Sequence, residues 1–74
     1  MTIDEFYRIA KITADYMPYE GTYILTVRAG AGFVRRFAYT NEFFRDAWDP
    51  TGYMRAEIYH AFLKWFKGDD DALV

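Results

Sequence analysis

Residues 22–40 read TYILTVRAGAGFVRRFAYT. Two runs in this stretch, residues 22–27 and 33–39, are rich in β-branched and aromatic residues, and Gly30-Ala31-Gly32 separates them. Strand-forming runs on either side of a short glycine-rich segment are typical of a β-hairpin. We therefore predict a hairpin over residues 21–40.

The length of the hairpin loop follows from where the apolar side chains fall. A loop of even length mixes them with the arginines, whereas a loop of odd length gathers them on one face, because side chains alternate along a strand. A three-residue loop with Gly32 in the left-handed conformation is a common arrangement of this kind. The apolar face then carries Tyr23, Leu25, Val27, Phe33, Phe37 and Tyr39, and the opposite face combines Ile24, Val34 and Ala38 with Thr22, Thr26, Arg28 and Arg36.

A helix is predicted before the hairpin. Thr2-Ile3-Asp4-Glu5 matches a capping box, with a threonine cap and a glutamate three residues later. Met17 precedes Pro18 and is therefore disfavoured in the α conformation, so we expect this helix to end near Tyr16. Apolar residues cover about twice the stripe that a one-sided amphipathic helix needs, so the helix should contact two surfaces.

A short helix is predicted directly after the hairpin. It should run from Glu42 to about Trp48, with Thr40 or Asn41 as its N-cap, because both residue types accept hydrogen bonds from the first backbone N–H groups of a helix.

A last helix should span about residues 52–67 and end at Gly68, which suits the residue just past a helix. The preceding stretch, Asp49-Pro50-Thr51-Gly52, has the residues of a turn, and Asp-Pro also suits the start of a new helix. The sequence leaves open whether the last two helices are separate or form one helix kinked at Pro50.

This order of elements predicts a single α+β domain over residues 1–68. It has an N-terminal helix, a β-hairpin, a short helix and a C-terminal helix (αββαα), with the helices packed on one face of an antiparallel sheet. An acidic tail over residues 69–74 follows, beginning with three aspartates. A two-stranded sheet is marginal alone, so we expect the helices, or pairing with another chain, to support it.

Aromatic side chains make up 22% of the 74 residues. A domain of about 60 residues buries only roughly 60% of its surface, so some rings should stay exposed, and exposed apolar patches usually mark contacts. The sequence therefore predicts a non-enzymatic protein-binding module, whose partner is a second copy in a structural homodimer or a different protein. Tyr and Trp are frequent interface anchors, and the candidate contact residues are Tyr16, Tyr19, Trp48, Tyr53, Tyr59 and Phe66.

Nucleic-acid binding is the alternative. Arg28, Arg35 and Arg36 lie in the stretch 21–40, which contains no Asp or Glu, so this basic zone is a candidate site for nucleic acid or for an acidic protein. The net charge of −2 and the isoelectric point near 5.2 argue against nucleic acid, since such domains are commonly basic.

Catalytic motifs are missing. The chain has no Ser and no Cys, which excludes serine and cysteine hydrolases. Its one histidine, His60, falls on the predicted polar face of the last helix, where a surface role is expected. We therefore predict no enzyme activity, no cofactor, no metal site and no small-molecule substrate.

No apolar run approaches the ~20 residues that span a bilayer, so no membrane partner is expected. The acids Asp4 and Glu5 stand where a signal peptide needs basic charge, which favours a cytoplasmic protein. In size, in its lack of cofactor motifs and in its helix–hairpin–helix order, the chain resembles small phage-encoded inhibitors of bacterial immunity, such as anti-CRISPR proteins. This resemblance lies in the overall plan and assigns no residue a role. It implies inhibition of a larger bacterial protein in the host cytoplasm.

Overall fold

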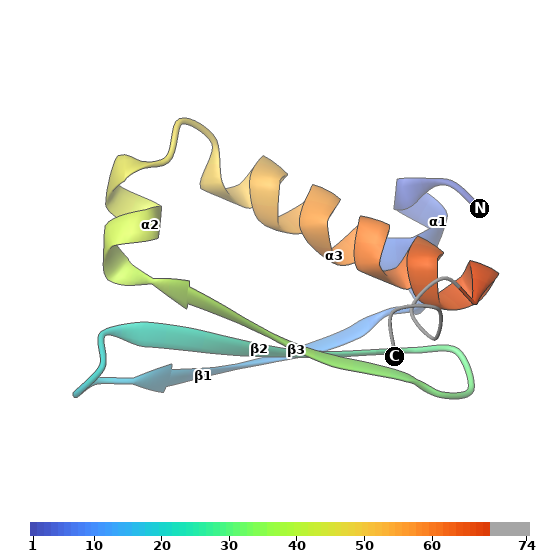
Figure 1. The fold of residues 1–74 in the computed structure, drawn as a ribbon, viewed down its shortest axis with the longest axis horizontal. Helices are drawn as coiled ribbons and strands as arrows, with labels where there is room; N and C mark the ends of the chain where they lie inside the picture. Colours follow the sequence, from blue (N-terminus) through green and yellow to red (C-terminus); the bar gives the residue numbers. More distant parts are fainter. Residues whose placement is uncertain (69–74) are drawn as a thin grey trace.

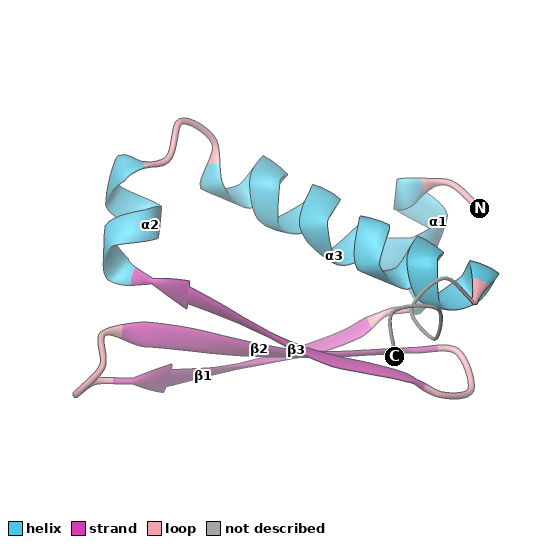
Figure 2. Cartoon of the chain, viewed as in Figure 1, coloured by secondary structure: helices cyan, strands magenta, loops and turns pink. Residues whose placement is uncertain are grey.

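The computed structural model describes residues 1–68, in which helices cover one face of a three-stranded antiparallel sheet (Figure 1, Figure 2). The strand order is β1-β2-β3, so β2 is central and β1 and β3 are the edges. The predicted α+β class and the helices on one face are confirmed, and a third strand is added. Residues 69–74, predicted as an acidic tail, lie outside the described part. The elements are α1 (Ile3–Ile9), β1 (Lys11–Met17), β2 (Thr22–Ala29), β3 (Phe33–Thr40), α2 (Asn41–Asp46) and α3 (Pro50–Lys67).

The N-terminal helix begins as predicted but is shorter. The capping box is present, because the Thr2 side chain accepts from the Glu5 N–H at 3.2 Å and the Glu5 carboxylate accepts from the Thr2 N–H at 3.2 Å. The helix ends at Ile9, and the residues expected to extend it to Tyr16 form strand β1. The predicted end of the helix was therefore wrong.

The reason for this difference is a two-residue period in β1. Side chains alternate along a strand, and polar Lys11, Thr13 and Asp15 alternate here with apolar Ile12, Ala14 and Tyr16. The strand pairs with β2 from Lys11 opposite Arg28 to Met17 opposite Thr22. A third strand of the same chain thus gives the hairpin the support that two strands lack.

The predicted hairpin is confirmed. Ala29 stands opposite Phe33, which leaves a three-residue loop. The left-handed residue of this loop was predicted at Gly32 but is Gly30, with a φ of 62°, whereas the φ of Gly32 is 145°. The face that the helices cover, here called the inner face, consequently carries Tyr23, Leu25, Val27, Phe33, Phe37 and Tyr39. The uncovered side of the sheet is the outer face (Figure 1).

One hydrogen bond fixes which backbone groups point out of the sheet at its two edges. The Asn41 N–H donates to the Gly21 carbonyl at 2.9 Å, in register with the β2–β3 pairing. In an antiparallel ladder the residues alternate between bonding a neighbour and facing away from it. Even-numbered residues of β3 therefore direct their N–H and C=O groups away from the sheet. The same alternation continues through β2 into β1. Given the register of these two strands, Ile12, Ala14 and Tyr16 of β1 also direct their N–H and C=O groups away from the sheet.

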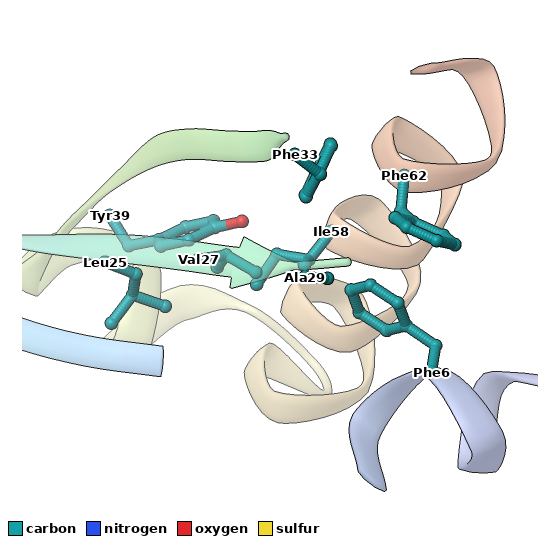
Figure 3. Packing of buried hydrophobic residues seen from close by; sticks show 8 residues of the cluster. All are labelled: Phe6, Leu25, Val27, Ala29, Phe33, Tyr39, Ile58 and Phe62. Atoms are coloured by element: carbon teal, nitrogen blue, oxygen red, sulfur yellow. The ribbon is translucent and has the colours of Figure 1, made fainter. Parts of the chain in front are cut away.

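The core lies between the inner face and the helices α1 and α3 (Figure 3). Phe6 of α1 is completely buried, and the centroid of its ring lies 4.7 Å from that of Phe62 in α3. A fully buried aromatic side chain contributes several kcal/mol to folding, so this contact holds α1 on α3. The buried residues are Phe6, Leu25, Val27, Ala29, Phe33, Tyr39, Ile58 and Phe62.

The two C-terminal helices are separate. Thr40 caps α2, as one of the two predicted alternatives, and α2 ends before Trp48, two residues short of the expected end. Asp49 caps α3 with Pro50 at its first position, and Gly68 ends it in the left-handed conformation with φ 82°. The kinked single helix is thereby excluded.

Candidate functional site

The structure does not bring the six predicted aromatic contact residues together. Tyr16 and Tyr19 belong to β1 and the β1–β2 turn, Trp48 lies between α2 and α3, and the others lie along α3. Five of them are exposed. The exposed fractions are 44% for Tyr16, 100% for Tyr19, 100% for Trp48, 58% for Tyr53 and 69% for Phe66.

Tyr59 and Tyr16 have structural contacts. The Tyr59 ring packs on Phe6 with a centroid distance of 5.8 Å, and its hydroxyl donates to the Met1 carbonyl. The Tyr16 hydroxyl accepts a hydrogen bond from the Asn41 side chain at 2.9 Å, and its ring lies 4.6 Å from that of Tyr23. Tyr59 is therefore a fold residue, and Tyr16 offers only part of its ring to a partner.

A groove lies between α3 and the edge strand β3, and we call it the α3–β3 groove. Its main hollow has a volume of about 620 Å³, which is within the range of ligand-sized clefts. Four of its lining side chains are aromatic or alanine and form an apolar floor. The lining residues are Phe37 of β3 and Tyr53, Ala56, Glu57, His60, Ala61 and Lys64 of α3.

The groove continues around the edge of the sheet. A second hollow of about 370 Å³ shares Tyr53 and Glu57 with the first, and it is also lined by Ala38, Tyr39 and Thr40. Tyr39 points to the inner face, whereas the other two β3 residues point to the outer face. Because residues of both faces line this hollow, it lies at the edge of β3, where a bound segment can contact backbone and side chains together.

Polar groups stand on the helix side of this apolar floor. Glu57, His60 and Lys64 follow one another at about one-turn spacing along α3, and all three are exposed. The Tyr39 hydroxyl donates to the Glu57 carboxylate. Burial, and after it the bond to Glu57, raises the pKa of Tyr39 above its ordinary value, so this hydroxyl stays a hydrogen-bond donor at neutral pH. An apolar floor with a polar rim is the usual anatomy of a protein interface.

The three predicted basic residues are divided between the two faces of the sheet. Arg28 and Arg36 lie on the outer face, where Lys11 stands opposite Arg28. Arg35 points to the inner face, with its guanidinium carbon 5.2 Å from the centroid of the Phe33 ring, and its side chain donates to the Val34 carbonyl.

The outer face of the three strands also lacks aromatic rings. In β1, β2 and β3 all aromatic side chains belong to inner-face positions. Arg36 moreover shares a hollow with Asp15. Single-strand binding combines basic charge with aromatic stacking, so the outer face supplies only the first of these two features.

His60 and Asp46 have ordinary surroundings. The hollow beside His60 has the apolar floor described above, and Asp46 forms a salt bridge with Arg45 at 3.0 Å. Within residues 1–68 no three His, Asp or Glu side chains gather to hold a metal ion. None of the described helices is long and apolar enough to cross a membrane.

Comparisons with protein-family models, with curated proteins and with solved structures find no match to this chain.

Sequence reasoning missed the α3–β3 groove and the open edge of β1. The groove depends on how far α3 stands from β3, which no local pattern encodes. The β1 edge had a signal, because the alternation from Lys11 to Tyr16 has the period of a strand.

Proposed function

We propose that the chain is a non-enzymatic protein-binding module that takes up an extended segment of a partner protein in the α3–β3 groove. The observation that carries this proposal is the continuity of the groove, from the α3 side chains to the open edge of β3. Extended segments commonly bind by adding a strand to a sheet edge, with main-chain hydrogen bonds for affinity and side-chain pockets for specificity.

The groove offers both kinds of contact. Ala38 directs its N–H and C=O groups away from the sheet, where a bound segment can pair with them. An apolar side chain of the same segment fits against Phe37 and Tyr53 in the main hollow. Trp48, in the connection that leads into α3, is fully exposed, and tryptophan is the residue type most enriched in interface hot spots.

The nature of the partner follows from this chemistry. It is a protein with an accessible extended segment that alternates an apolar side chain with polar ones. The resemblance to small inhibitors of bacterial immunity makes a larger bacterial defence protein the first class of target to screen.

A peptide selection tests the proposal. Random dodecapeptides displayed on phage are selected against the immobilised protein, and the dissociation constants of the enriched peptides are measured by fluorescence anisotropy. Ala38→Pro removes an outward N–H without breaking the β2–β3 ladder. It should weaken peptide binding by about tenfold, since the loss of one main-chain hydrogen bond that leaves its acceptor unpaired costs about 1–3 kcal/mol.

Val34→Pro is the matched control. Val34 belongs to the same strand and has the same outward backbone orientation, but it does not line the groove. Its substitution should leave peptide affinity within about twofold of the original, with both variants folded by circular dichroism. Equal affinity of the selected peptides for Ala38→Pro and for the unchanged protein contradicts the proposal.

A further inference from the structure

β1 is an edge strand that nothing in residues 1–68 covers. All seven of its residues are exposed, and Ile12 on its inner face is 41% exposed. Natural sheet edges are usually blunted by charged side chains, by proline, by a bulge, by an inward-pointing charge or by a covering element. β1 carries charges only on its outer face, at Lys11 and Asp15. It has no proline, it pairs with β2 without a bulge, and its inner-face residues Ile12, Ala14 and Tyr16 carry no charge.

The backbone of this edge is ready for pairing. The N–H and C=O groups of Ile12, Ala14 and Tyr16 point away from β2, as established above from the register. A strand that pairs with β1 bonds to these groups. In a second copy the same residues point outward, and outward-pointing residues must stand opposite each other for their backbone groups to bond. Two antiparallel β1 strands can therefore pair only in registers in which the two-fold axis passes through a residue that stands opposite its own copy.

The charges of β1 select one such register. In one register Thr13 stands opposite Thr13 of the partner subunit. Lys11 then stands opposite Asp15 of the partner subunit, and Asp15 stands opposite Lys11 of the partner subunit. These three residues lie on the outer face, in the non-hydrogen-bonded pairs, where side chains of opposing strands are closest. Opposite-charge pairs and Thr–Thr pairs at directly opposed positions stabilise a sheet.

Neighbouring registers lose this complementarity. A centre on Asp15 places this carboxylate opposite its own copy, and like charges directly opposed are destabilising. A centre on Ala14 places Lys11 opposite Met17 of the partner subunit, and a centre on Ile12 places it opposite Thr13 of the partner subunit. Only the centre on Thr13 pairs each charge of β1 with its opposite.

We propose that two copies of the chain form a homodimer by antiparallel pairing of their β1 strands about Thr13. The two-fold axis is perpendicular to the sheet, so the strands of both copies form one continuous sheet in the order β3-β2-β1-β1-β2-β3, with all helices on one side. Pairing covers the inner-face residues Ile12 and Ala14 against each other across the axis. The β3 edges remain at the two ends, so this inference goes beyond the proposed function and does not depend on it.

Cysteine cross-linking tests both the dimer and its register. The chain contains no cysteine, so Thr13→Cys introduces a single thiol. In the proposed register it faces its own copy at a Cα separation of about 4.5 Å, which a disulfide can span. Mild oxidation of this variant should give a covalent dimer, seen on a non-reducing gel. The dimer should form about tenfold faster than it would between thiols that meet only by random collision in solution.

Thr26→Cys is the matched control. Thr26 stands opposite Thr13 on β2 and on the same outer face, but two copies of it are separated by three strand spacings of about 4.8 Å each, beyond the reach of a disulfide. Cross-linking of Thr13→Cys no faster than that of Thr26→Cys, at the same protein concentration, overturns the proposal. So does a monomeric mass for the unchanged chain by light scattering at every concentration tested.

A charge exchange tests the register without new covalent chemistry. Lys11→Asp and Asp15→Lys each turn both opposite-charge pairs of the dimer into like-charge pairs, and each should raise its dissociation constant about tenfold. The double variant restores opposite charges and should return to within about threefold of the unchanged protein. Within the chain, Lys11→Asp turns the like-charge pair of Lys11 and Arg28 into an opposite-charge pair, which favours the pairing of β1 with β2. Weaker dimerisation of this variant therefore cannot be ascribed to unfolding of β1. Failure of the double variant to recover overturns the register about Thr13.

Discussion

β1 and β3 both flank the central strand β2, yet every residue of β1 is exposed whereas Phe33 and Tyr39 of β3 are buried. β3 lies beside α3 and carries the inward-pointing Arg35 in its first half. An inward charge is one of the devices that prevent a strand from pairing at an open edge, so only the second half of β3, along the groove, is open to a partner. β1 has no such device and offers its whole length. The two edges of the sheet therefore differ in how much of their backbone is open to pairing.

The two edges also differ in how they are anchored, and Phe6 provides the largest test of this difference. α1 leads into β1, and Phe6 is the one completely buried residue of α1. Phe6→Ala should lower the free energy of unfolding by about 3–5 kcal/mol, measured by urea denaturation. Amide hydrogen exchange should then increase in β1 before it increases in β3. Simultaneous loss of protection in both strands contradicts this unequal anchoring.

Tyr39 ties β3 to α3 through the Glu57 carboxylate, whereas Tyr16 of β1 is bonded to the neutral side chain of Asn41 in α2. Tyr39→Phe should lower the free energy of unfolding by about 1.5 kcal/mol, the lower end of the range for hydrogen bonds to charged groups, because Glu57 is exposed. The unfolded chain releases the tyrosine proton near pH 10, whereas the folded chain holds it to a higher pH because the pKa of Tyr39 is raised.

The stabilisation by Tyr39 is therefore complete below about pH 10 and is lost as the pH rises further. Urea denaturation between pH 8 and pH 11 measures this loss, and Tyr39→Phe should make the decrease less steep. Some decrease should remain, because burial also raises the pKa of Tyr7. An identical decrease in Tyr39→Phe and in the unchanged protein contradicts this assignment.

The smallest expected effects concern the two threonine caps next to these edges. Thr2 caps α1 before β1 in a reciprocal capping box, and Thr40 caps α2 after β3 with a single bond to the Phe43 N–H at 3.1 Å. Thr2→Ala should cost about 1 kcal/mol, and Thr40→Ala slightly less. Thermal denaturation followed by circular dichroism measures both. A larger loss for Thr40→Ala shows that β3 depends more on its helix than β1 does.

Local chemistry made most of the fold predictable. The hairpin was set by the alternation of residues 22–39 about Gly30 and Gly32, and the start of each helix by Thr2, Thr40 and Asp49. These features act within a few residues, so the sequence displays them directly.

The extent of α1 and the candidate site depended on contacts between distant residues. Residues 11–17 carry both helical spacing and alternation, and pairing with β2 settles the conflict in favour of a strand, because tertiary contacts override local preference. Three of the six aromatic candidates, Tyr53, Tyr59 and Phe66, were correctly placed on the last helix, whereas Tyr16 lies in β1 and Trp48 lies beyond the end of α2. The separation of the six in space and the groove beside Tyr53 follow from packing that no short pattern specifies.

The two tryptophans give the molecule a built-in pair of optical reporters. Trp65 is half-buried, with its ring centroid 5.6 Å from that of Phe33 and 5.8 Å from that of Phe62, whereas Trp48 is fully exposed to water. Indole emission shifts to longer wavelength in water, so the blue part of the fluorescence follows the core and the red part follows the α2–α3 connection. Quenching by iodide should affect Trp48 first. The unlabelled chain can thus report unfolding and ligand capture in one spectrum, at two separate wavelengths.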